Sequence, residues 1–170
     1  SIEKKLKIKF KKNNILVTFH PETLEKNTFS NLIQLLNALK KLQNYLIIFT
    51  RSNADNENNK FTRKIIDFVN KNKNSIMFNS LGAVNYFSVI KQVDFVIGNS
   101  SSGVIEIPSM KIPTINVGNR QNGRIKSSSV IDCEPLTENI IEIIKKVRSK
   151  KFIQQLKKIK NPYYKTNVSS

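Results

Sequence analysis

The chain has 170 residues, of which 39% are hydrophobic, and this is enough for one domain with a substantial core. Its formal net charge of +17 at pH 7 would suit a polyanion, but the lysines are scattered and the usual recognition motifs are missing, so we do not expect nucleic acid as the partner. No apolar segment approaches the ~20 residues that cross a bilayer, and we therefore expect no membrane partner.

Short apolar runs alternate with amphipathic segments, which predicts strands that alternate with helices. Residues 1–12 are charged, and we expect them to form an interdomain connection. The first half then predicts, in chain order, a strand over 14–19, a helix over 25–42, a strand over 45–50, a helix over 58–70, a strand over 75–78 and a helix over 84–91. The second half predicts a strand over 94–97, a helix over 103–110, a strand over 112–117, a short strand over 130–131 and a helix over 136–147. We expect Pro108 to be accepted because it lies near the start of its helix.

This series of strand–helix units predicts an α/β fold in which a parallel sheet carries helices on both faces, as in Rossmann-like domains. The strands are almost continuously apolar, as fully buried strands are. We expect the domain to cover residues 13–160. Residues 161–170 lack periodicity and are expected to form a truncated C-terminal tail.

Ligands of an open parallel sheet bind beyond the carboxyl ends of its strands, so the loops after the strands hold the candidate site. These loops contain the only histidine of the chain, several glycines and two arginines. They are residues 20–23, 51–55, 79–82, 98–103 and 118–124. Polar, hydrogen-bonding and cationic groups therefore converge on one rim.

The clearest candidate on this rim is the segment 98–103, with the sequence GNSSSG. A strand leads into it and a helix leaves it, so free backbone N–H groups and the positive end of the helix would face a phosphate. Its candidate binding residues are Gly98, Asn99, Ser100, Ser101 and Ser102. The alternative is an ordinary helix start with a serine cap, because the segment has neither the lysine of a P-loop nor the glycine spacing of a dinucleotide-binding loop.

Four single residues of the rim have both a functional and a plain interpretation. His20 suits contact with a pyrophosphate or proton transfer near neutral pH, or is a loop residue held by Pro21. Glu106 can accept hydrogen bonds from sugar hydroxyls, or it is an exposed carboxylate that is only stabilised by the helix dipole. Arg120 and Arg124 suit bidentate binding of phosphate, or are solvated surface charges.

Cysteine and histidine are each present once. The single Cys133 excludes an internal disulfide and suits the reducing cytoplasm, where we expect the protein. One histidine and one cysteine are too few for a zinc site, and we expect no metal. The lysine-rich start shows no signal peptide, and because Ser1 is not methionine we expect a piece of a longer chain.

Three segments carry a resemblance to a known family: VTFHPET (Val17–Thr23), FTRSNAD (Phe49–Asp55) and GNSSSGVIEIPSMKIPTINVGNRQNGR (Gly98–Arg124). Together they resemble the UDP-N-acetylglucosamine 2-epimerases, and among these the hydrolysing enzymes of sialic-acid and related nonulosonic-acid biosynthesis. The match runs in register over 12–124 and more loosely to 161–163, and the third segment is highly specific.

The resemblance implies the C-terminal half of a two-domain enzyme of the glycosyltransferase-B type. Two Rossmann-like domains would face each other across a cleft, and residues 13–160 would bind the nucleotide of a UDP-sugar substrate. The first domain would precede Ser1, and a segment after Ser170 would return to it. Its own N-terminal domain and further copies in a homo-oligomer are therefore the implied partners.

The resemblance also implies roles for residues of the rim. His20 would contact the pyrophosphate and assist the departure of UDP, and Ser100 and Ser101 would bind the phosphates. Glu106 would accept hydrogen bonds from the ribose hydroxyls, and Arg120 would lie beside the phosphates and the ribose. Asn53 and the backbone around Leu81 would border the nucleotide. Arg124 lies in the matched segment without a definite role.

The implied reaction is elimination of UDP across C1–C2 of the sugar, followed by hydration to N-acetylmannosamine or its 2,4-diacetamido analogue, with no cofactor. The carboxylates that handle the ring protons belong to the first domain, so we expect this chain alone to bind nucleotide weakly without turnover. Two other functions stay open: one domain of a retaining glycosyltransferase, which needs an acceptor site, and a non-enzymatic basic module that binds nucleic acid.

Overall fold

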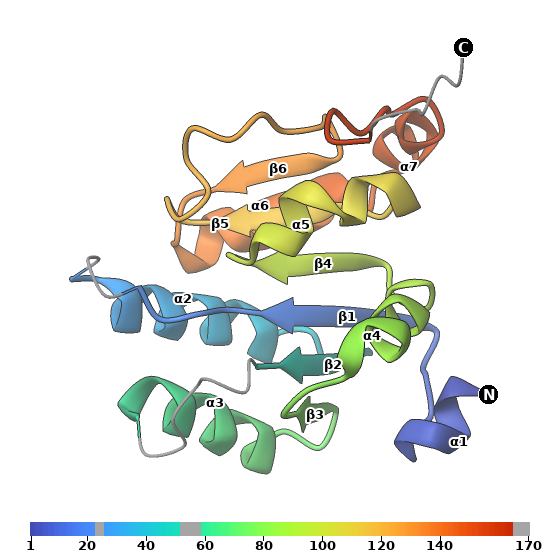
Figure 1. The fold of residues 1–170 in the computed structure, drawn as a ribbon. Coiled ribbons are helices and arrows are strands. Elements are labelled where there is room, and N and C mark those ends of the chain that lie inside the picture. The colour runs from blue at the N-terminus through green and yellow to red at the C-terminus, as the bar shows by residue number, and fades with distance from the viewer. Residues whose placement is uncertain (23–25, 52–58, 165–170) are drawn as a thin grey trace.

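Parallel strands form the centre of the structure, a computed structural model that describes residues 1–22, 26–51 and 59–164 (Figure 1). Within these residues, six strands form one sheet in the order β3-β2-β1-β4-β5-β6, with every neighbouring pair parallel. The strands are β1 (Asn13–Thr18), β2 (Tyr45–Thr50), β3 (Ser75–Phe78), β4 (Phe95–Gly98), β5 (Thr114–Val117) and β6 (Val130–Cys133). This is the Rossmann order, and the predicted α/β class with a parallel sheet is confirmed.

Helices cover both faces of the sheet (Figure 1). One layer holds α2 (Thr28–Lys40), α3 (Lys60–Lys71), α6 (Thr137–Val147) and α7 (Lys150–Leu156). The other holds α1 (Ile2–Leu6), α4 (Gly82–Ile90), α5 (Ser101–Ile105) and the 3₁₀ turn η1 (Ile107–Met110). Side chains of a strand point alternately to the two layers, so Ile15 and Val17 of β1 pack in the first core and Leu16 in the second. Each of the three is fully buried, which stabilises the fold by roughly 1.5–3 kcal/mol per side chain.

The prediction of one helix over 103–110 is wrong. Helix α5 begins two residues earlier, at Ser101, and ends at Ile105, and η1 follows after Glu106. Pro108 is the reason, because it has no N–H to donate to the carbonyl of Val104 and its ring would collide with that carbonyl. The proline instead lies at the start of η1, where no helical donor is needed.

Two helices were not predicted. Ser1 caps α1, and its apolar residues Ile2 and Leu6 pack against the second core together with Ile8 and Phe10. Helix α7 buries Phe152 and Leu156 in the first core. The other predicted helices and strands are present with ends shifted by a few residues. No helix in the described ranges is long and apolar enough to cross a membrane.

Cys133 ends β6 and is buried, with its thiol 3.3 Å from the carbonyl oxygen of Glu134. Burial, and secondarily the negative charge of Glu134, raise its pKa from the ordinary 9.0 to about 11. The thiol is therefore protonated at pH 8, and we expect a disulfide reagent to react with it much more slowly in the folded chain than in guanidinium chloride.

The same shift sets a pH dependence of stability. Because the folded chain holds the thiol proton more tightly, this contribution to stability is complete below pH 9 and is lost as the pH rises towards about 11. Denaturant unfolding of the native chain and of Cys133→Ser between pH 8 and 11 measures it. Equal thiol reactivity of the folded and unfolded chains at pH 8 would show that the burial is wrong.

Candidate functional site

The carboxyl ends of β1 and β4 lie side by side in the middle of the sheet, with Thr18 opposite Gly98. After β1 the chain goes on to α2 in the first layer, whereas after β4 it turns into α5 in the second layer (Figure 1). Strand order reverses at this point, and the loops that leave in opposite directions open a crevice between them. The predicted rim therefore centres on the switch point of the sheet.

Gly98 allows the two strand ends to approach. Its φ is +149°, and a Cβ built on it would lie 1.9 Å from the carbonyl oxygen of Thr18. Gly103 is similarly close to β5, since its Cβ would lie 2.7 Å from Cγ2 of Thr114. The glycines of the segment 98–103 thus serve close backbone packing at both ends of the loop.

Asn99 connects the loops of the rim from below and has no exposed surface. Its side-chain Oδ1 accepts from the backbone N–H of His20 at 2.7 Å, and its Nδ2 donates to the carbonyl of His20 at 2.9 Å. Nδ2 also lies 3.4 Å from Oε1 of Glu22. Its backbone carbonyl accepts from Nη1 of Arg120 at 3.0 Å and from Nε2 of Gln121 at 2.9 Å. One buried residue therefore binds the loops after β1 and β5 to the loop after β4.

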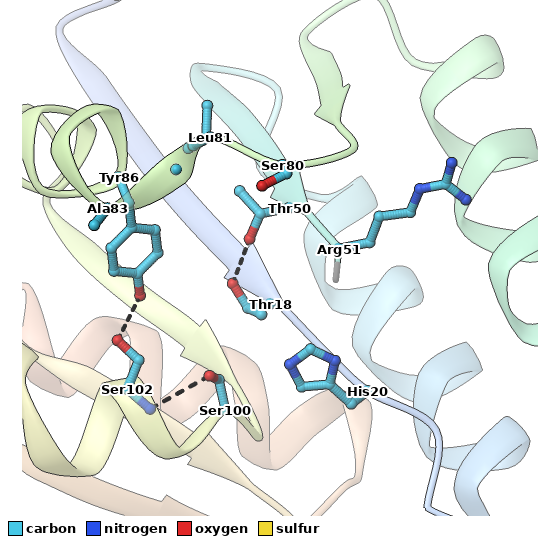
Figure 2. A pocket seen from close by; sticks show the side chains of 11 residues that line it. Thr18, His20, Thr50, Arg51, Ser80, Leu81, Ala83, Tyr86, Ser100 and Ser102 are labelled. Carbon is cyan, nitrogen blue, oxygen red and sulfur yellow. Dashed lines mark hydrogen bonds between the residues drawn. The ribbon is translucent and has the colours of Figure 1, made fainter. Parts of the chain in front are cut away.

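A cavity of about 300 Å³ lies beside the loops that Asn99 joins, with His20, Ser100 and Ser102 in its lining (Figure 2). Its lining combines hydroxyl, imidazole and apolar groups from strand ends, loops and helices, namely Thr18, His20, Thr50, Arg51, Ser80, Leu81, Gly82, Ala83, Tyr86, Ser100 and Ser102. At its floor the hydroxyls of Thr18 and Thr50 lie 2.7 Å apart. Figure 2 shows the side chain of Arg51 extending away from the other lining groups, and its Nε donates to Oδ1 of Asn79 at 2.9 Å.

A chain of hydrogen bonds runs from α4 to the end of α5. The hydroxyl of Tyr86 lies 2.9 Å from Oγ of Ser102 (Figure 2). This Oγ in turn donates to Oε2 of Glu106 at 3.4 Å. Burial raises the pKa of Tyr86 above 10.0, and the charge of Glu106 raises it further, although the hydrogen bond to Ser102 acts in the opposite direction. Tyr86 therefore stays a neutral donor at pH 7, and the exposed carboxylate of Glu106 accepts a hydrogen bond from Ser102, which lines the cavity.

The remaining predicted residues are placed as follows. Ser100 caps α5 by accepting from the N–H of Ser102 at 3.4 Å, and Ser101 is half-exposed in the first turn. Because α5 has only five residues, its dipole is smaller than that of the longer helix predicted. Arg124 is exposed on the loop after β5, and Asn53 lies outside the described residues.

Several residues of the site were not singled out from the sequence. Thr18 and Thr50 lie in predicted strands, and Tyr86 lies in a predicted helix. Gln121 is 3% exposed, and its Oε1 has no hydrogen-bond donor within the described part of the chain. A buried acceptor without a donor costs about 1–3 kcal/mol. A polar residue in a Gly/Asn-rich loop was the only signal for Gln121 in the sequence.

The arrangement is suited to an anion that also carries hydroxyl groups. Hydroxyls, the imidazole of His20 and the guanidinium of Arg120 supply donors, whereas the carboxylate of Glu106 is an acceptor for sugar hydroxyls. In the ranges that the structure describes, no three histidine, cysteine, aspartate or glutamate side chains come together as metal ligands.

Comparison with known proteins gives the same family along the whole chain. The profile of the family described as UDP-N-acetylglucosamine 2-epimerase matches residues 1–170. The chain is 41% identical over 156 residues to the "GDP/UDP-N,N'-diacetylbacillosamine 2-epimerase (hydrolyzing)" of Campylobacter jejuni. It is 38% identical over 159 residues to the "Polysialic acid biosynthesis protein P7" of Escherichia coli. These alignments cover 90% and 92% of this chain but 40% of each relative, so the chain spans about two fifths of their length.

Among solved structures, the fold is similar to that of the S. aureus MnaA–UDP complex, with a TM-score of 0.73 and 15% sequence identity. The superposition covers 97% of this chain and 43% of that one. At this identity the similarity supports the fold alone.

Proposed function

The chain belongs to the UDP-N-acetylglucosamine 2-epimerase family, and from this premise we propose that it is the nucleotide-binding part of a hydrolysing UDP-sugar 2-epimerase. The observation that carries the proposal is the cavity at the switch point, where His20, Ser100 and Ser102 line one space. Arg120 and Glu106 are tied to the same loop by hydrogen bonds. This set offers a cation and several donors to a diphosphate and an acceptor to a ribose.

In the proposed complex each group has a separate task. Ser100 and Ser101 bind the phosphates, and Arg120 adds its charge beside them. Glu106 accepts from the ribose hydroxyls, supported by its hydrogen bond from Ser102. His20 contacts the pyrophosphate, where a donor stabilises the negative charge that UDP gains as its bond to C1 of the sugar breaks.

The proposed reaction eliminates UDP across C1–C2 and then hydrates the unsaturated sugar. The product is N-acetylmannosamine or its 2,4-diacetamido analogue, and the name of the C. jejuni relative favours a diacetamido sugar. The groups that move the ring protons belong to the proposed N-terminal domain, with residues 1–12 as the connection, 13–160 as the nucleotide-binding domain and 161–170 as the start of the returning tail. We further propose that the whole enzyme is a cytoplasmic homo-oligomer.

Calorimetry with UDP, GDP, ADP and a short DNA duplex tests the proposal. We expect UDP to bind best, and Glu106→Ala to weaken UDP about tenfold or more, because hydrogen bonds to a charged group contribute about 1.5–3 kcal/mol. Glu138→Ala, on the surface of α6, is the matched control for loss of a carboxylate and should bind UDP as the native chain does.

The salt dependence separates this function from nucleic-acid binding. Binding of DNA through six to ten phosphate contacts weakens by about 10³–10⁵ between 50 and 200 mM salt, whereas a diphosphate site changes far less. Tight, strongly salt-dependent DNA binding that is unaffected by Glu106→Ala, together with no binding of UDP, would refute the proposed function. Release of UDP from a UDP-sugar by residues 1–170 alone would refute the need for the N-terminal domain.

A further inference from the structure

Gln121 is buried beneath the rim with only half of its amide used. Its Nε2 donates to the carbonyl of Asn99, whereas its Oε1 has no donor within the described part of the chain. The cost of a buried acceptor without a donor is at least comparable to the gain from one neutral hydrogen bond. Stability alone therefore does not favour glutamine here, since an apolar side chain of the same length would avoid that cost.

The hydrogen bond from Gln121 holds Asn99, and Asn99 in turn holds the backbone of His20. The side chain of Asn99 forms hydrogen bonds with both the N–H and the carbonyl of His20, so the backbone of His20 follows any movement of Asn99. The N–H of Asn99 donates to the carbonyl of Thr18 at 3.1 Å. With its carbonyl also held by Gln121, Asn99 is fixed at its N–H, its carbonyl and its side chain.

Arg120 shares the same acceptor. Its Nη1 donates to the carbonyl of Asn99, and a carbonyl has two lone pairs, so both donors fit. Arg120 is exposed, whereas Asn99 is fully buried. If Arg120 alone satisfied this carbonyl, turning towards a ligand would leave a buried acceptor without a donor. With Gln121 in place, the carbonyl keeps a partner when Arg120 leaves it.

We propose that Gln121 is a positioning residue, which keeps Asn99 and His20 in place while Arg120 exchanges the Asn99 carbonyl for the diphosphate. The proposal rests on the proposed function, because it assigns a diphosphate to Arg120. Gln121 itself does not touch the ligand and acts only through Asn99.

The test compares Gln121→Met with the native chain and with Asn122→Met, an exposed position of the same loop whose side chain bonds only weakly to Asn119. Binding of UDP is measured by calorimetry, and His20, the only histidine, gives a single imidazole signal in NMR. We expect Gln121→Met to bind UDP about tenfold more weakly, which corresponds to about 1.4 kcal/mol. We also expect its His20 signal to shift and the His20 amide to exchange faster, with a melting temperature within about 4 °C of the native value.

The possible outcomes distinguish a positioning role of Gln121 from a purely structural one. Weaker UDP binding with a shifted His20 signal, at nearly native melting temperature and absent from Asn122→Met, supports the positioning role. Native UDP affinity in Gln121→Met overturns it, as does a loss of affinity that merely accompanies unfolding. If the native chain does not bind UDP, the proposed function is wrong. The exchange rate of the His20 amide then tests the structural link by itself. Faster exchange in Gln121→Met supports a link from Gln121 to His20 through Asn99, and unchanged exchange excludes it.

Discussion

Gly98→Ala is expected to destabilise the chain by more than about 4 kcal/mol, which is among the largest effects of a single substitution. The added Cβ would lie 1.9 Å from the carbonyl oxygen of Thr18, where both strands are fully paired and neither can move aside. The φ of +149° adds backbone strain for any residue with a side chain. Since a domain is stable by only about 5–15 kcal/mol, much of the protein should be unfolded or insoluble.

Guanidinium chloride unfolding measures this loss, and Gly123→Ala is the matched control. Gly123 also has a positive φ, +82°, but no atom lies within 4 Å of its added Cβ. Its replacement should therefore cost only the backbone term of about 1–2 kcal/mol. Similar losses for the two variants would mean that β1 and β4 are not in contact at Gly98.

Arg120→Ala is expected to weaken binding of UDP by about 10- to 150-fold, the effect of removing hydrogen bonds from a cation worth about 1.5–3 kcal/mol. The guanidinium carries five N–H donors in a planar fork, which suits bidentate contact with phosphate oxygens once Nη1 has left the carbonyl of Asn99. Arg120→Lys keeps the charge but not the planar fork, and its affinity for UDP should lie between those of the native chain and Arg120→Ala.

Arg63→Ala removes the same charge from the surface of α3 and serves as the control for long-range attraction. Calorimetry at 50 and 200 mM salt should show native affinity for this control. Equal weakening in Arg63→Ala and Arg120→Ala would reduce the role of Arg120 to general charge, and no weakening in Arg120→Ala would remove it from the site.

Much of the fold can be predicted because the four inner strands, β1, β2, β4 and β5, are buried on both faces and are largely apolar. Helix α1 escaped prediction because lysines separate its two apolar residues, and its packing depends on Ile8 and Phe10 beyond the helix. The break after Ile105 could have been predicted, since Pro108 removes the donor that a continuous helix needs.

The rim could be predicted because parallel strands end at the same edge, which brings their following loops together. The residues beneath the rim could not. Thr18 and Thr50 face each other only because β1 pairs with β2, and Tyr86 meets Ser102 only because α4 lies beside α5. Gln121 is part of the site because it donates to the carbonyl of Asn99. Such pairings follow from strand order rather than from local sequence.

Asn99 has a consequence for how the site fluctuates. Because its hydrogen bonds hold the segments after β1 and β5 to its own, none of the three can separate from the others without exposing a buried amide or carbonyl. Local unfolding around His20, Asn99 and Gln121 is therefore coupled, and these parts of the three loops form a single cooperative unit. A ligand that orders any one of them orders all three.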